Sequence, residues 1–173
     1  VDPAHICGLS IRGLLAIAMC HADEDLCASL ILADTFAVHP DGEAIYDRSM
    51  AASDNLRAMA EARVDVLIAQ PADPTVRTEV IETMARIDPA AYRIGAEAVW
   101  LADQRDRAGE IEVPTLVLCG TEDKVTPPTL STELADLIPG TRLELIEGAG
   151  HIGNLEKPAE FNRILDQFLS TLG

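Results

Sequence analysis

The sequence predicts an α/β fold in which a mostly parallel sheet is covered by helices on both faces. Short apolar runs such as ASLILAD and PTLVLCG lack the polar alternation of half-exposed strands, which is typical of strands buried on both sides. Helix-like segments alternate with these runs, and that alternation indicates right-handed crossovers between parallel strands. A helix-like stretch of roughly 60 residues interrupts the pattern, and because it exceeds an ordinary crossover we interpret it as an inserted cap.

The elements are expected in a simple order. A strand at AHICG leads through the turn GLSIRG into a helix at LLAIAMC, and ASLILAD forms the next strand. Helix-like segments cover residues 44–69, 74–87 and 89–102, the last two beginning at proline as helices often do. Strands return at PTLVLCG and RLELIE, with a helix opening at PPTLSTELADLI between them. The final segment is an amphipathic helix, since its apolar residues recur every three or four positions: Phe161, Ile164, Leu165, Phe168 and Leu172.

Length and charge narrow the function classes. The 173 residues, 48% of them hydrophobic, suffice for one globular domain with a sizeable core. The formal net charge of -16 produces a surface that repels phosphate backbones and anionic lipid, so neither nucleic acid nor a membrane is expected as a partner. No apolar run approaches the roughly 18 residues that span a bilayer, and no signal-peptide pattern opens the chain. We therefore expect a cytoplasmic protein.

The four cysteines give no sign of a disulfide framework or a metal site. Cys7 and Cys119 lie in apolar strand-like runs and are expected in the core, where a thiol behaves as a small hydrophobe. Cys20, His21 and Cys27 could form a metal cluster, but no C-x-x-C pair accompanies them. No metal site is therefore expected.

The stretch GLSIRG raises the main question about function. A nucleophilic serine on a sharp strand-to-helix turn usually lies in G-x-S-x-G, because both glycines allow close packing of the backbone. Here Gly8 precedes Ser10, but Arg12 occupies the place of the second glycine, and Gly13 could supply part of the lost clearance. The stretch therefore indicates either a nucleophile elbow or an ordinary serine at a helix start.

An acid and a base follow in the order that serine catalysis on an α/β sheet requires. Asp123 comes just after a predicted strand, at the edge where such sheets place functional groups, and Glu122 is the alternative acid. His151 lies in GAGHIGN, whose glycines let an imidazole reach back over the sheet edge. Each residue alone has an ordinary structural explanation. The ordered set of Ser10, Asp123 and His151, each after its own predicted strand, is far more specific.

The stretches CGLSIRG, VPTLVLCGTEDKVTPP and GAGHIGNLEKPAEFN resemble α/β-hydrolase-fold enzymes, most closely the 3-oxoadipate enol-lactonase-like group. The resemblance implies a cofactor-free serine hydrolase of a small ester or lactone. In it Ser10 would be the nucleophile, Asp123 the orienting acid and His151 the general base. Ile11 would give one backbone N–H to the oxyanion hole. Arg12 would pair with a substrate carboxylate or, alternatively, with one of the protein's many acids.

The resemblance also implies a division of the chain. Residues 1–39 and 103–173 would form the α/β-hydrolase core, and residues 40–102 the helical cap. The family normally begins with further strands and a loop that gives the second oxyanion N–H, and these are absent from this chain. We therefore expect a bare edge on the first strand, completed by an amino-terminal segment or by another chain in a homo-oligomer.

Two alternatives stay open. Within enzymes, related families use the same triad to hydrolyse carbon–carbon bonds or to act as haloperoxidases. In a different class, the chain would be a ligand-binding or scaffold relative that has lost turnover, a reading that Arg12 favours.

Overall fold

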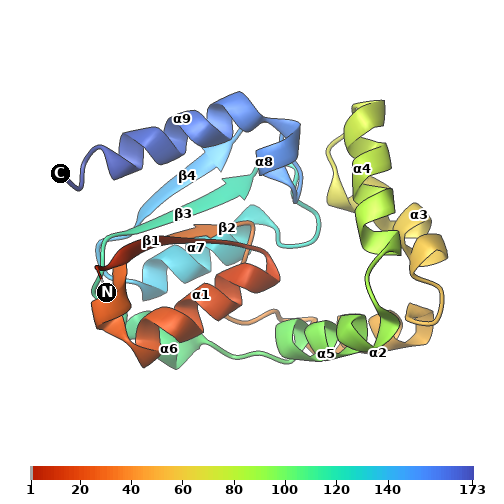
Figure 1. Cartoon of the computed structure of the whole chain (residues 1–173), viewed down its shortest axis with the longest axis horizontal. Helices are drawn as coiled ribbons and strands as arrows, with labels where there is room; N and C mark the ends of the chain where they lie inside the picture. Colours follow the sequence, from red (N-terminus) through yellow and green to blue (C-terminus); the bar gives the residue numbers. More distant parts are fainter. Residues whose placement is uncertain (1) are drawn as a thin grey trace.

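The computed structural model describes residues 2–173 and consists of a parallel sheet with helices on both faces (Figure 1). Within these residues the strands lie in the order β1-β2-β3-β4, and every neighbouring pair is parallel. Their bounds are β1 (Ala4–Leu9), β2 (Cys27–Ala33), β3 (Thr115–Gly120) and β4 (Arg142–Ile146). The predicted fold class is confirmed.

The helices follow the predicted order, but one predicted helix is divided in two, and the short helices η1, α6 and α8 were not predicted. Their bounds are α1 (Ile11–Ala22), the short 3-10 helix η1 (Glu24–Leu26), α2 (Gly42–Ala52), α3 (Leu56–Leu67), α4 (Pro74–Ala85), α5 (Pro89–Trp100), α6 (Arg105–Gly109), α7 (Pro128–Leu137), α8 (Gly153–Glu156) and α9 (Pro158–Leu169). The single helical segment predicted over residues 44–69 is two helices, because Asn55 accepts the Ala58 N–H at 3.0 Å and caps a new helix. No helix within residues 2–173 is both long and apolar enough to cross a membrane.

Helices cover the sheet from two sides (Figure 1). On one face α1, α6 and α7 pack against β2 and β3 through buried residues that include Ile17, Leu30, Val117 and Leu134. On the other face α9 packs on the sheet, with Phe161, Ile164 and Phe168 against Ile31, Leu116 and Ile146. Both faces of β2 and β3 are therefore buried, which explains why these strands show no polar alternation.

Strand β1 forms one edge of the described sheet. It pairs with β2 alone among residues 2–173, and most of its residues are exposed or half-buried. Cys119 is buried in β3 as predicted, but Cys7 is exposed, so its predicted place in the core is wrong. The reason is that Cys7 lies on the edge strand, whereas the apolar residues of α9 pack mainly on β2, β3 and β4.

Helices α2 to α5 lie together beyond the carboxyl ends of the strands (Figure 1). Helix α2 contacts α5, and α3 contacts α4. Their apolar faces share one cluster with Leu14 of α1 and with Val125 and Leu130 near the start of α7. This layer covers the edge of the sheet at which the predicted catalytic side chains converge.

Candidate active site

Ser10 occupies a sharp turn between β1 and α1. Its backbone angles are φ 55° and ψ -125°, a region that residues other than glycine rarely adopt. Its N–H donates to the Ala33 carbonyl at 3.0 Å, and its own carbonyl accepts from the Thr35 hydroxyl at 2.9 Å. Hydrogen bonds to the end of β2 thus hold a strained conformation that presents the serine hydroxyl at the carboxyl edge of the sheet.

The two glycines of GLSIRG each meet a close neighbour. A Cβ atom at Gly8 would lie 2.3 Å from the Arg12 carbonyl oxygen, and one at Gly13 would lie 2.6 Å from the Thr35 methyl carbon. The Arg12 side chain is exposed. Gly13 therefore allows α1 to lie close to Thr35, which follows β2. An arginine at position 12 is accommodated because its side chain lies at the surface.

The three side chains predicted to form a triad are in direct contact. His151 Nε2 lies 2.9 Å from Ser10 Oγ, and His151 Nδ1 lies 2.9 Å from Asp123 Oδ2. His151 is 4% exposed and Asp123 is 3% exposed, so water is largely excluded from the second contact. Glu122, the alternative acid, is exposed and makes no hydrogen bond to His151 in the described part of the chain.

Asp123 is held as a buried carboxylate. Its Oδ1 accepts the N–H groups of Val125 and Thr126 at 2.8 and 2.9 Å, and its Oδ2 accepts the Thr126 hydroxyl at 2.6 Å. Burial alone would raise the pKa of Asp123, but the hydrogen bonds from His151 and Thr126 outweigh it and the pKa is lowered. An ionised Asp123 can orient the imidazole and stabilise its protonated form.

The loop that carries His151 is held by hydrogen bonds to the end of α3 and to the residues that follow it. The His151 N–H donates to the Leu67 carbonyl at 2.9 Å. Glu156 accepts the Gly150 N–H at 3.0 Å through Oε1 and the Ala69 N–H at 2.7 Å through Oε2. Sequence reasoning missed Glu156, because a glutamate after a glycine-rich loop does not reveal which N–H groups it accepts.

Comparison with known proteins identifies the fold family. A family model described as the alpha/beta hydrolase fold matches residues 53–158, which is more than half of the chain. This chain belongs to the α/β-hydrolase fold family. The resemblance noted in the sequence is thereby confirmed.

Several α/β-hydrolase-fold proteins are similar over most of this chain. It is 26% identical to 3-oxoadipate enol-lactonase 1 of Acinetobacter baylyi, covering 99% of this chain and 66% of that protein. It is 27% identical to a pimeloyl-acyl-carrier-protein methyl ester esterase of Neisseria meningitidis, covering 96% of this chain and 57% of that protein. The crystal structure of the enol-lactonase from Burkholderia xenovorans superimposes with a TM-score of 0.90 at 29% identity, covering 98% of this chain and 66% of that one. The chain thus spans 57% to 66% of the length of these relatives.

A second buried acid, Asp34, lies beside the predicted triad in this α/β-hydrolase fold. It is 1% exposed, has a positive φ of 46°, and accepts the Gly120 N–H at 2.9 Å. Burial raises the pKa of Asp34 to about 7, although His151 and the Gly120 N–H act in the opposite direction. Sequence analysis did not single out Asp34, whose position at the carboxyl end of a predicted strand was the available signal.

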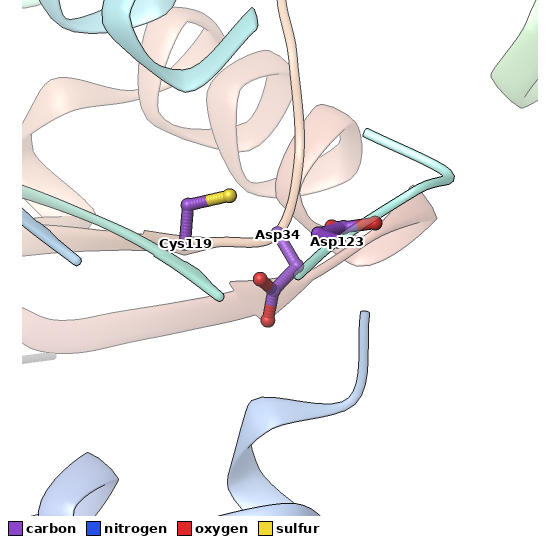
Figure 2. Close-up of side chains that lie close together, drawn as sticks. All are labelled: Asp34, Cys119 and Asp123. Carbon is purple, nitrogen blue, oxygen red and sulfur yellow. The ribbon is translucent and has the colours of Figure 1, made fainter. Parts of the chain in front are cut away.

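Asp34, Cys119 and Asp123 form a compact cluster at the ends of β2 and β3 (Figure 2). One polar atom from each lies within 4.8 Å of the others, so the cluster has the spacing of a metal site. Burial raises the pKa of the Cys119 thiol to about 12, however, and a metal ligand must be a thiolate. Both oxygens of Asp123 also accept hydrogen bonds already. We therefore interpret the cluster as structural support for the triad.

Ile11, predicted to donate to the oxyanion hole, is the first residue of α1. The N–H groups in the first turn of a helix have no intrahelical acceptor, so the Ile11 N–H is free to donate next to the Ser10 hydroxyl. We identify no second donor for this purpose within residues 2–173.

Proposed function

We propose that this chain carries the catalytic residues of a cofactor-free serine hydrolase that cleaves a small ester or lactone. The observation that carries the proposal is the continuous contact from Ser10 Oγ through the His151 imidazole to Asp123, with 2.9 Å at each step. Such contacts are what a serine needs in order to lose its proton as it attacks a carbonyl carbon.

In the proposed mechanism each group has one step. Ser10 Oγ attacks the carbonyl carbon while its proton passes to His151 Nε2, and Asp123 stabilises the resulting imidazolium through Nδ1. The Ile11 N–H donates to the oxygen that becomes negative in the tetrahedral intermediate. His151 then returns the proton to the leaving alkoxide, which departs as an alcohol and leaves an acyl group on Ser10. Water, activated by the same imidazole, releases the acid and restores the serine.

The named relatives support this substrate class. The Acinetobacter and Burkholderia proteins are enol-lactonases and the Neisseria protein is a methyl ester esterase. In both classes a carbonyl carbon bears an oxygen leaving group, which is the bond that the proposed mechanism breaks. We therefore place the chain with carboxylic ester and lactone hydrolases.

Variants of the serine and of two neighbouring acids test the proposal. We expect Ser10→Ala to lower kcat for a p-nitrophenyl short-chain ester by about 10⁴-fold or more, and to abolish labelling by a fluorophosphonate probe. Asp123→Asn should lower kcat by about 10⁴-fold, because the histidine would then be held in the wrong tautomer. Glu122→Gln changes the adjacent, exposed acid and should leave turnover unchanged. If the unmodified chain is folded but is neither labelled by the probe nor active on the ester, the proposal is wrong and the chain is a non-catalytic relative.

Arg12 is proposed to recognise a carboxylate on the substrate. Its exposed side chain lies two residues from Ser10 and makes no ion pair within residues 2–173. Arg12→Gly should keep activity on neutral esters and raise KM for substrates that bear a carboxylate. An equal change for both kinds of substrate would show that Arg12 does not select for charge.

A further inference from the structure

A hollow with a volume of about 590 Å³ lies where the layer of α2 to α5 meets the start of α7. Its walls come from α2, α3, the end of α5, the start of α7 and the loops that precede α2 and α7. Much of the lining is apolar and includes Ile45, Met59, Trp100 and Leu130. Ser10, Asp123 and His151 are not among its lining residues, but Val125, whose N–H donates to Asp123 Oδ1 at 2.8 Å, does line it.

Positive charge gathers at this hollow in a protein whose net charge is -16. Arg48, Arg63 and Lys124 line it, and Asp41 is the acid among the lining residues. None of these three cations forms an ion pair in the part of the chain that the structure describes. Six arginines elsewhere do pair with acids: Arg57, Arg77, Arg93, Arg105, Arg142 and Arg163. The hollow thus offers unpaired cations where the rest of the surface offers mainly carboxylates.

An unpaired hydroxyl lies in the same wall. Ser49 is 2% exposed, lines the hollow, and its Oγ has no hydrogen-bond partner among the described residues. Buried polar groups are nearly always paired, and one that is not calls for an explanation. Because Oγ itself is fully buried, a ligand oxygen beside α2 would become its partner when the Ser49 side chain turns toward the hollow.

Contacts of His39 within the protein hold the apolar wall of the hollow in place without a ligand. The His39 ring donates from Nε2 to the Val125 carbonyl at 3.2 Å and accepts the Asp41 N–H at Nδ1 at 3.1 Å. The same ring packs edge-on against Trp100, with centroids 5.6 Å apart. A fixed wall lowers the ordering cost of binding, because fewer side chains lose freedom when a ligand enters.

We propose that this hollow is a second, non-catalytic binding site for a small amphipathic anion, a carboxylate on an apolar body. The apolar body would lie against Met59, Trp100 and Leu130, while the carboxylate would face Arg48, Arg63 and Lys124. The volume falls in the range of roughly 300 to 1,000 Å³ that small-molecule pockets occupy. The apolar lining disfavours a bare inorganic anion, and the unpaired cations disfavour a neutral lipid.

Trp100 makes the proposal directly measurable, because it is the one tryptophan of the sequence and it lines the hollow. We expect octanoate to produce a saturable change in tryptophan fluorescence. The neutral 1-octanol, which has the same chain length, should bind at least several-fold more weakly. The combined variant Arg48→Gln and Arg63→Gln should weaken octanoate binding about tenfold, since two partly solvated charge pairs are lost. Arg86→Gln, an exposed arginine outside the hollow, is the matched control and should bind as the unmodified chain does.

Two further arms separate this site from the catalytic one. Ser10→Ala and the unmodified protein should bind octanoate with the same affinity. Ala62→Phe, which places a ring in the hollow from an exposed helix position, should abolish the fluorescence titration while leaving the far-UV spectrum unchanged. Equal affinity for octanoate and octanol, or an unaltered titration in the double arginine variant, would overturn the proposal. So would competition between octanoate and a fluorophosphonate for Ser10, which would place octanoate in the catalytic site.

Discussion

Replacing Asp34 by asparagine removes an ionisable group from the buried cluster while keeping its size and one acceptor oxygen for the Gly120 N–H. In the folded protein burial raises the pKa of Asp34 to about 7 from an ordinary value of 3.8. Between these two values the folded chain keeps a proton that the unfolded chain has lost. The contribution of Asp34 to stability therefore falls as the pH rises from about 4 to about 7.

The size of the effect follows from the two pKa values. The difference between 3.8 and about 7 is about 3 units, and at 1.36 kcal/mol per unit it corresponds to about 4 kcal/mol. Part of this loss occurs below pH 5, and about 2 to 3 kcal/mol of it falls between pH 5 and pH 8. Asparagine does not titrate. The free energy of unfolding of the unmodified protein should therefore drop by about 2 to 3 kcal/mol more than that of Asp34→Asn over this interval.

Urea denaturation at pH 5, 6, 7 and 8 measures this difference. Asp123 and Cys119, whose pKa values are lowered and raised respectively, are present in both proteins, so their own contributions largely cancel. Asp103→Asn is a suitable control, because Asp103 is an exposed acid whose pKa its partner Arg105 lowers to about 2, well below the interval. Parallel stability curves for Asp34→Asn and the unmodified protein would refute the reasoning, since Asp34 would then be ionised throughout.

Two further predictions concern the turn and the histidine loop. Gly13→Ala should lower the free energy of unfolding by about 1 to 3 kcal/mol, because the new methyl group would overlap Thr35 at 2.6 Å, and this overpacking exceeds the gain in helix propensity. Urea denaturation measures it, and a stabilised variant would contradict it. Glu156→Gln should cost about 1 to 2 kcal/mol and lower esterase turnover, because an amide has one acceptor oxygen where the carboxylate used two for Ala69 and Gly150. Unchanged unfolding and kcat would show that the loop does not depend on this residue.

The sequence predicted those parts of the fold and site that a single physical requirement determines. The parallel sheet was predictable because β2 and β3 must be apolar on both faces, and Asp123 and His151 stood out because each follows a strand at the same edge. Features that depend on the order of the strands or on particular hydrogen-bond partners were not predictable. The exposure of Cys7 depends on which strand lies at the edge, the break at Asn55 on a local cap within a helix-like pattern, and the role of Glu156 on a partner 87 positions away in the sequence.

The distances in sequence between the residues of the proposed triad have a consequence for folding kinetics. Asp123 and His151 are 28 positions apart and come from adjacent strands, whereas Ser10 and His151 are 141 positions apart. Closing the longer loop costs more chain entropy, and contacts of high sequence separation form slowly. We expect the acid–base pair to assemble with the β3–β4 unit, and the hydroxyl to join it only when β1 has docked. The reactivity of Ser10 would then report the last step of folding. A fluorophosphonate added during refolding would label only the chains that have completed this step.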